Sequence, residues 1–134
     1  MSKYNVPADV PNELHEIYEK NMDAATAGTG RMNLFACDQK IELLNDVFDD
    51  GGNKIPLSSN DPEHFFKIGQ ATHDAGTIGV LAGQLGLISH YARDYPNIPY
   101  LVKLNSKSHM VKTSQRDPVS QAMWDLEDVM ALIR

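Results

Sequence analysis

The sequence predicts an α/β protein built on a parallel sheet. Three short apolar runs, at residues 32–37, 78–82 and 99–105, alternate with segments that carry helical patterns. Nearly unbroken apolar runs are typical of strands that are buried on both faces, as in a parallel sheet covered by helices. Because strands and helices alternate along the chain, we expect parallel strands joined by right-handed crossovers.

Composition is that of one globular unit. The 134 residues correspond to about one domain, and 42% apolar with 22% charged residues is ordinary globular usage. The net charge of −6 argues against a nucleic-acid-binding surface, which needs a local excess of Lys and Arg. The first residues lack the apolar core of a signal peptide, and the apolar stretch 78–88 is too short for a membrane span of about 20 residues. We therefore expect a cytoplasmic protein without nucleic-acid or membrane partners.

An arm and a helix are predicted for residues 1–30. The helix begins at Pro11, and Gly28 and Gly30 end it. Its apolar side chains recur at helical spacing and form one stripe, which consists of Leu14, Ile17, Tyr18 and Met22. We expect the sheet domain to occupy the remaining residues, 31–134.

The first strand–helix unit of that domain begins with the apolar run 32–37, which stops at Asp38. Residues 46–60 are rich in turn formers and predict a long loop. Asp61-Pro62-Glu63 then predicts a helix start, with a capping side chain, a proline at the first position and an acid in the first turn. This helix is expected to run to about Asp74, with Gly76 ending it.

The second and third units repeat the pattern. A strand at 78–82 precedes a short helix at about 85–91, and a strand at 99–105 precedes the polar loop 106–117. A final helix is expected over 125–134, with Asp125 as its cap. Three parallel strands leave two open edges, which are aggregation sites unless something covers them. The pattern therefore indicates an incomplete domain.

Polar side chains lie at the predicted carboxyl ends of the strands, where α/β proteins bind their ligands. They are Asp38 after the first strand, Gln84 after the second, and Lys103 with Asn105 at the end of the third. A lysine within so apolar a run is unusual, and burial can make a lysine a nucleophile or an electrostatic stabiliser. Asp38 is its natural partner. The structural alternative is a buried Asp38–Lys103 ion pair, or a lysine that reaches water from the strand end.

Segments 34–42, 61–64, 83–88 and 100–107 together resemble the archaeal-type class I fructose-bisphosphate aldolases. The more specific parts are Asp38-x-x-Ile41-Glu42 and Val102-Lys103-Leu104-Asn105. The resemblance runs through nearly the whole chain in the family's order. It implies a (β/α)₈ TIM barrel, of which this chain holds about the first three strand–helix units. It also implies reversible cleavage of fructose 1,6-bisphosphate into dihydroxyacetone phosphate and glyceraldehyde 3-phosphate, through a lysine Schiff base and without a metal or other cofactor.

Carried onto this sequence, the resemblance makes Asp38 and Lys103 the catalytic side chains. Gln84, Asn105 and Lys107 are expected to bind substrate. The family's Schiff-base lysine and phosphate-binding loops lie further along the barrel, so we expect this chain to be inactive alone. In the other interpretation, Lys103 is the Schiff-base lysine of a smaller aldolase, but three strands cannot enclose the desolvated pocket that this chemistry needs. Leu43 stands where relatives commonly have histidine, which puts a proton-transfer task at that position in doubt.

Two further functional hypotheses stay open. The chain is either a non-catalytic half-barrel that assembles with another chain, or a related class I aldolase that acts on another phosphorylated sugar. In every aldolase interpretation the partners are a phosphorylated sugar and either a complementing chain or further copies in a homo-oligomer, and the setting is glycolysis and gluconeogenesis. No metal is expected, because the acidic turn at 46–57 lacks ligands at two EF-hand positions and the histidines lack zinc-site spacing. Cys37 is expected to be a small core residue.

Overall fold

The computed structural model describes residues 3–38, 61–106 and 121–132. Its elements, in chain order, are η1 (Asn12–Leu14), α1 (His15–Ala25), β1 (Leu34–Ala36), α3 (Glu63–Asp74), β2 (Val80–Gln84), α4 (Leu85–Tyr91), β3 (Tyr100–Lys103), β4 (Asn105–Ser106), β5 (Gln121–Ala122) and α5 (Leu126–Leu132).

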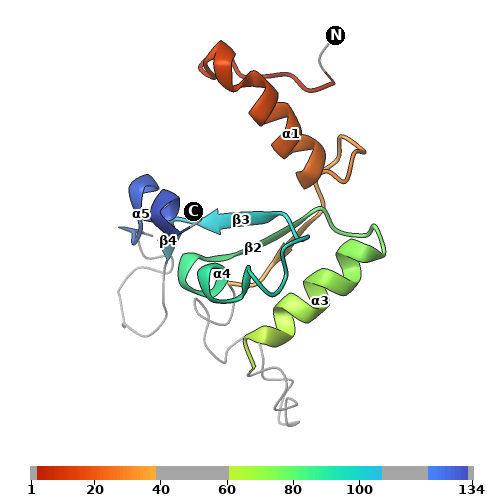
Figure 1. Ribbon diagram of the computed structural model, residues 1–134, viewed down its shortest axis with the longest axis vertical. Coiled ribbons are helices and arrows are strands. Elements are labelled where there is room, and N and C mark those ends of the chain that lie inside the picture. The colour runs from red at the N-terminus through yellow and green to blue at the C-terminus, as the bar shows by residue number, and fades with distance from the viewer. Residues whose placement is uncertain (1–2, 39–60, 107–120, 133–134) are drawn as a thin grey trace, which may run out of the picture.

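The main sheet has three parallel strands in the order β1-β2-β3 (Figure 1). In the register, Ala82 of β2 lies opposite Ala36 of β1 and opposite Leu101 of β3. All five residues of β2 are buried, as expected for a central strand. The predicted alternation of parallel strands with helices is therefore confirmed.

One face of the sheet packs against α3 and α4. Leu81 of β2 is fully buried there against Phe66 of α3, and Cys37 and Ile98 complete the buried cluster. The rings of Phe66 and Tyr91 lie 4.8 Å apart between centroids. Full burial of a leucine or phenylalanine side chain contributes about 1.5–3 kcal/mol, so this cluster is the main attachment of the helices to the sheet.

The opposite face of the sheet carries Leu34, Ala36, Val80, Ala82 and Leu101, because side chains alternate along each strand. Leu34 and Leu101 are 41% and 40% exposed, although both are large apolar residues. The prediction that the first strand is buried on both faces was therefore wrong. The reason is that β1 is an edge strand of this sheet, and α3 and α4 cover only the other face. In a closed barrel this face would be the packed interior.

Helix α1 meets the sheet through its C-terminal end. A Cβ atom on Gly79, just before β2, would lie 1.9 Å from the Ala25 carbonyl oxygen, so the two backbones touch there. Figure 1 shows the rest of α1 running away from the strands. The predicted apolar stripe is present, but Leu14 and Ile17 are 44% and 55% exposed. None of the described elements covers these two side chains.

The limits of all three strands differ from the prediction, and β1 covers only Leu34–Ala36 of the run 32–37. β2 runs from Val80 to Gln84 and not from 78 to 82. It begins later because the Ile78 N–H donates back to the Thr72 carbonyl of α3, while the Gly79 and Val80 N–H groups both donate to the Asn33 carbonyl. β3 ends at Lys103, and Asn105 instead starts β4, which pairs antiparallel with β5. That ribbon was not predicted, because two-residue polar strands carry no periodic apolar pattern.

Two of the predicted helix starts, those of α3 and α5, are confirmed by capping contacts. The Glu63 N–H donates to the Asp61 carboxylate over 3.0 Å, and the Asp128 N–H donates to the Asp125 carboxylate over 2.9 Å. In return the Asp125 N–H donates to Asp128, which makes a reciprocal capping box. Gly76, with a φ of 68°, follows α3 in the left-handed conformation that suits glycine. Among the helices of the described ranges, none has the length and apolar character that a membrane crossing requires. The long loop expected at 46–60 lies outside the described residues.

Candidate functional site

An ion pair joins the carboxyl ends of the two outer strands. The Lys103 Nζ donates a hydrogen bond to the Asp38 Oδ2 over 2.5 Å. Lys103 is the last residue of β3, and Asp38 follows β1 by two residues. The two side chains are only 22% and 17% exposed. The sequence places these residues 65 positions apart, and the parallel sheet brings them together.

Both side chains lie on the sheet face opposite α3 and α4. Cys37 belongs to the buried cluster under the helices, so Asp38, the next residue, points the other way. Lys103 shares its face with Leu101, as the alternation predicted. The pair therefore lies on the face that forms the interior of a closed barrel, at the carboxyl end where barrel enzymes carry their active sites.

Gln84 completes a row of polar side chains across the three strands. It is the last residue of β2, the register partner of Lys103, and only 7% exposed. The Cys37 N–H donates to the Ala82 carbonyl over 2.8 Å, which continues the β1–β2 ladder past Ala36 and sets Asp38 level with Gln84. The arrangement of Asp38, Gln84 and Lys103 at one edge follows from the parallel register.

This row combines three kinds of chemistry. Asp38 is a carboxylate that can exchange a proton, Lys103 is a cation that can stabilise developing negative charge, and Gln84 is a neutral hydrogen-bonding group. Charges act over a lower effective dielectric when they are mostly buried, so their effect on a bound molecule is stronger than at an open surface. The same contact is also what a purely structural ion pair would show, so the roles assigned to Asp38 and Lys103 stay predictions.

Of the remaining predicted site residues, only Asn105 is described, and it does not join this row. Asn105 lies beyond β3 in the ribbon formed by β4 and β5, and it is exposed. Lys107, together with Ile41, Glu42 and Leu43 of the resemblance, lies outside the described residues. The described part of the chain therefore supplies three side chains at the carboxyl edge.

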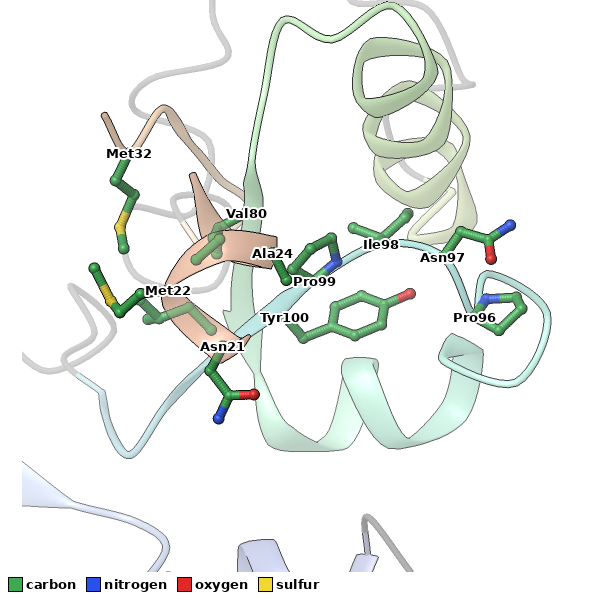
Figure 2. A pocket seen from close by; sticks show the side chains of 12 residues that line it. Asn21, Met22, Ala24, Met32, Val80, Pro96, Asn97, Ile98, Pro99 and Tyr100 are labelled. Carbon is green, nitrogen blue, oxygen red and sulfur yellow. The ribbon is translucent and has the colours of Figure 1, made fainter. Parts of the chain in front are cut away.

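A hollow of about 500 Å³ lies at the other end of the sheet (Figure 2). Met22, Met32, Val80, Pro99 and Tyr100 are among the residues around it, and none of the described residues that line it carries a carboxylate, amine or imidazole. Val80 is four residues before Gln84 along β2, which is about 13 Å at the rise of an extended strand. The hollow lies at the amino ends of the strands and is separate from the polar row.

Within residues 3–38, 61–106 and 121–132, no three His, Cys, Asp or Glu side chains are arranged to hold a metal ion. The acidic turn weighed above as a calcium loop lies outside these ranges.

Cys37 lies beside the polar row, and only 5% of its surface is exposed. This burial, together with the charge of Asp38, raises the pKa of the Cys37 thiol to about 12. Because the thiolate is the reactive form, native Cys37 should resist alkylation by iodoacetamide at pH 8. We expect labelling at least about 100-fold slower than in the urea-unfolded chain, where an ordinary thiol pKa near 8.5 applies. Mass spectrometry of quenched samples measures both rates. Equal rates would contradict the burial of this thiol.

Comparison with known proteins finds similarity to proteins that are named fructose-bisphosphate aldolase. No family model matches the chain. Over 127 residues the chain is 48% identical to the fructose-bisphosphate aldolase/6-deoxy-5-ketofructose 1-phosphate synthase of Methanocaldococcus jannaschii. This alignment covers 95% of this chain and 38% of that protein. The solved fructose-bisphosphate aldolase from Slackia heliotrinireducens matches with a TM-score of 0.83 and 52% identity, over 98% of this chain and 39% of that one.

A second solved structure shares the fold. It is an archaeal fructose-1,6-bisphosphate aldolase with its catalytic lysine bound to the carbinolamine intermediate of the substrate, and it matches with a TM-score of 0.56 at 24% identity, over 84% of this chain and 39% of that one. The chain thus spans about two-fifths of the length of these proteins. The predicted resemblance and the predicted fold class, part of a TIM barrel, are confirmed.

Proposed function

We propose that this chain is part of a class I fructose-bisphosphate aldolase, which cleaves fructose 1,6-bisphosphate reversibly into dihydroxyacetone phosphate and glyceraldehyde 3-phosphate through a lysine Schiff base. The observation that carries the proposal is the 2.5 Å contact between Asp38 and Lys103 at the carboxyl edge of the sheet. Identities of 48% and 52% with proteins named fructose-bisphosphate aldolase support it.

In this proposal Asp38 and Lys103 act on a sugar held by a Schiff-base lysine elsewhere in the barrel. Asp38 exchanges a proton with the oxygens of the reacting carbon chain, a task that suits a positioned carboxylate. Lys103 stabilises negative charge that develops beside Asp38. Gln84, Asn105 and Lys107 bind substrate oxygens.

Three strands of an eight-stranded barrel cannot enclose the desolvated pocket that Schiff-base chemistry needs, so the chain alone is inactive. Borohydride reduction in the presence of dihydroxyacetone phosphate should therefore trap no adduct on the isolated chain. A chimera in which this chain replaces the matching segment of the Slackia heliotrinireducens aldolase should give a trapped adduct on a lysine outside this chain. Peptide mass spectrometry locates the adduct.

An adduct on Lys103 in either sample would instead make Lys103 the nucleophile and overturn its auxiliary role. A folded chimera that neither forms an adduct nor cleaves fructose 1,6-bisphosphate would overturn the proposed function. Circular dichroism of the chimera supplies the control for folding.

A second candidate is aldol chemistry on another phosphorylated sugar. It is favoured by the name of the Methanocaldococcus jannaschii relative, which includes a 6-deoxy-5-ketofructose 1-phosphate synthase activity. The two candidates share the polar row and differ only in the sugar. Comparing kcat/KM for the two sugar phosphates, with this chain assembled into a complete barrel, distinguishes them.

The edges of the sheet support assembly with further strands. Within the described main sheet, β1 and β3 each pair with β2 alone, so each has one edge of backbone groups available for pairing. We propose that a complementing chain or a second copy covers these edges, whether the half-barrel acts catalytically or only as a partner. The expected setting is the cytoplasm, in glycolysis and gluconeogenesis.

A further inference from the structure

The side-chain amide of Gln84 is a buried hydrogen-bond donor without an acceptor among the described residues. The Nε2 of Gln84 is buried and makes no hydrogen bond with any described residue. The described ranges contain one other buried side-chain nitrogen that makes no hydrogen bond, the Nδ1 of His73, but this atom lies 3.8 Å from the Asp74 carboxylate. Leaving a buried donor unpaired is unfavourable, so an unpaired donor in a folded protein calls for a specific reason.

The neighbours of Gln84 suggest what that reason is. Gln84 lies level with Lys103 in the register and on the same face as Asp38 and Lys103. The Lys103 ammonium donates to the Asp38 carboxylate, so the two charges compensate one another. The amide of Gln84 is thus a neutral donor beside an internally balanced ion pair, at the edge where a ligand would bind.

We propose that Gln84 determines specificity by donating a hydrogen bond from Nε2 to a neutral oxygen, a hydroxyl or carbonyl, on the carbon chain of the bound sugar phosphate. This inference rests on the proposed function. The phosphate group is the wrong partner here, because a buried dianion needs a cation, and the cation of this row already faces a carboxylate. A site built to bond a substrate oxygen also rejects analogues that lack that oxygen.

The first test observes the amide directly in the ¹⁵N-labelled chimera, in which this chain is part of a complete barrel. Dihydroxyacetone phosphate, which carries a carbonyl and a hydroxyl, should shift the Gln84 side-chain ¹⁵N–¹H₂ signals in a saturable way, and inorganic phosphate should leave them in place. The Gln84→Met variant assigns these signals. Absence of a shift with dihydroxyacetone phosphate, or an equal shift with inorganic phosphate, would overturn the inference.

The second test compares variants with a matched control. Backbone signals of Val102 and Lys103 report ligand binding, and Gln84→Met should weaken the binding of dihydroxyacetone phosphate about tenfold, the usual effect of losing one such bond. Gln84→Glu keeps the shape but loses the amide donor, and it should weaken binding at least as much. Gln70→Met is the control, because Gln70 lies on α3 and its amide bonds Asp74 over 2.6 Å. Unchanged affinity in both Gln84 variants would contradict the proposal.

Thermal unfolding separates a ligand-binding amide from a structural one. An amide without a protein partner is dispensable for folding, so Gln84→Met should leave the midpoint unchanged or raise it by about 2–4 °C. A lower midpoint would show that Gln84 has a structural partner and would overturn the inference. Turnover is not needed for these readouts. If the chimera is inactive but dihydroxyacetone phosphate still shifts the Gln84 side-chain signals, only the aldolase function is rejected. If the chimera is active but these signals do not shift, only the role of Gln84 is rejected.

Discussion

Replacing Asp38 by asparagine in the chimera should lower kcat for fructose 1,6-bisphosphate cleavage by at least about 100-fold, the usual contribution of a positioned proton-transfer group. Asparagine has nearly the same shape, but it cannot exchange a proton, and it leaves the Lys103 ammonium without the counter-charge now 2.5 Å away. KM should change much less, because the interaction is made with the reacting atoms. A coupled assay that follows triose phosphate release measures both constants.

Asp125→Asn is the matched control, because this exposed aspartate caps α5 and is not part of the polar row. A purely structural ion pair predicts a different outcome. Removing one buried charge destabilises a protein, whereas replacing both partners restores much of the stability. If the double variant Asp38→Asn/Lys103→Met regained stability and activity together, the pair would be structural only. Recovery of stability without activity supports catalysis.

Among substitutions of the described glycines by alanine, Gly79→Ala should lower the free energy of unfolding the most. A Cβ at this position would meet the Ala25 carbonyl oxygen at 1.9 Å and the Ala25 carbonyl carbon at 2.7 Å. Both are backbone atoms of the end of α1, so the helix has to move away from the start of β2. We expect the free energy of unfolding to fall by about 3 kcal/mol, at the upper end of the usual cost of overpacking. Urea unfolding followed by circular dichroism measures the loss.

Gly86→Ala provides the control within the same chain. Gly86 lies in α4, and no described atom would come within 4 Å of a Cβ there, apart from its own neighbours in the helix. Alanine favours a helix over glycine by about 1 kcal/mol, so this variant should be unchanged or slightly more stable. Equal losses for the two variants would contradict the close approach of α1 and β2.

The sequence indicated the parallel sheet and the edge of the site because both depend on coarse signals. Apolar runs marked the three strands, and a polar residue near the end of each run marked its carboxyl end. This is how Asp38, Gln84 and Lys103 could be grouped before their contacts were known. The exact limits of β2 depended on hydrogen bonds from Gly79 and Val80 to Asn33, which no local pattern encodes.

Other features could not be predicted because they depend on the tertiary structure. The ribbon of β4 and β5 exists only because Asn105 and Ser106 pair with residues far along the chain. The exposure of Leu34 was missed because its apolar character suits the interior of a larger sheet, whereas α3 and α4 cover only one face here. The absence of a described partner for the Gln84 amide depends on three-dimensional packing alone.

The contact between Asp38 and Lys103 also affects how a substrate reaches the site. A carboxylate and an ammonium 2.5 Å apart act at a distance as a dipole, whose field decays faster than that of a single charge. The chain as a whole carries a net charge of −6, which repels a sugar bisphosphate during diffusional encounter. Attraction that guides such an anion toward the row must therefore come from cations outside the ion pair, and the pair itself contributes selectivity after the substrate has arrived more than speed of capture.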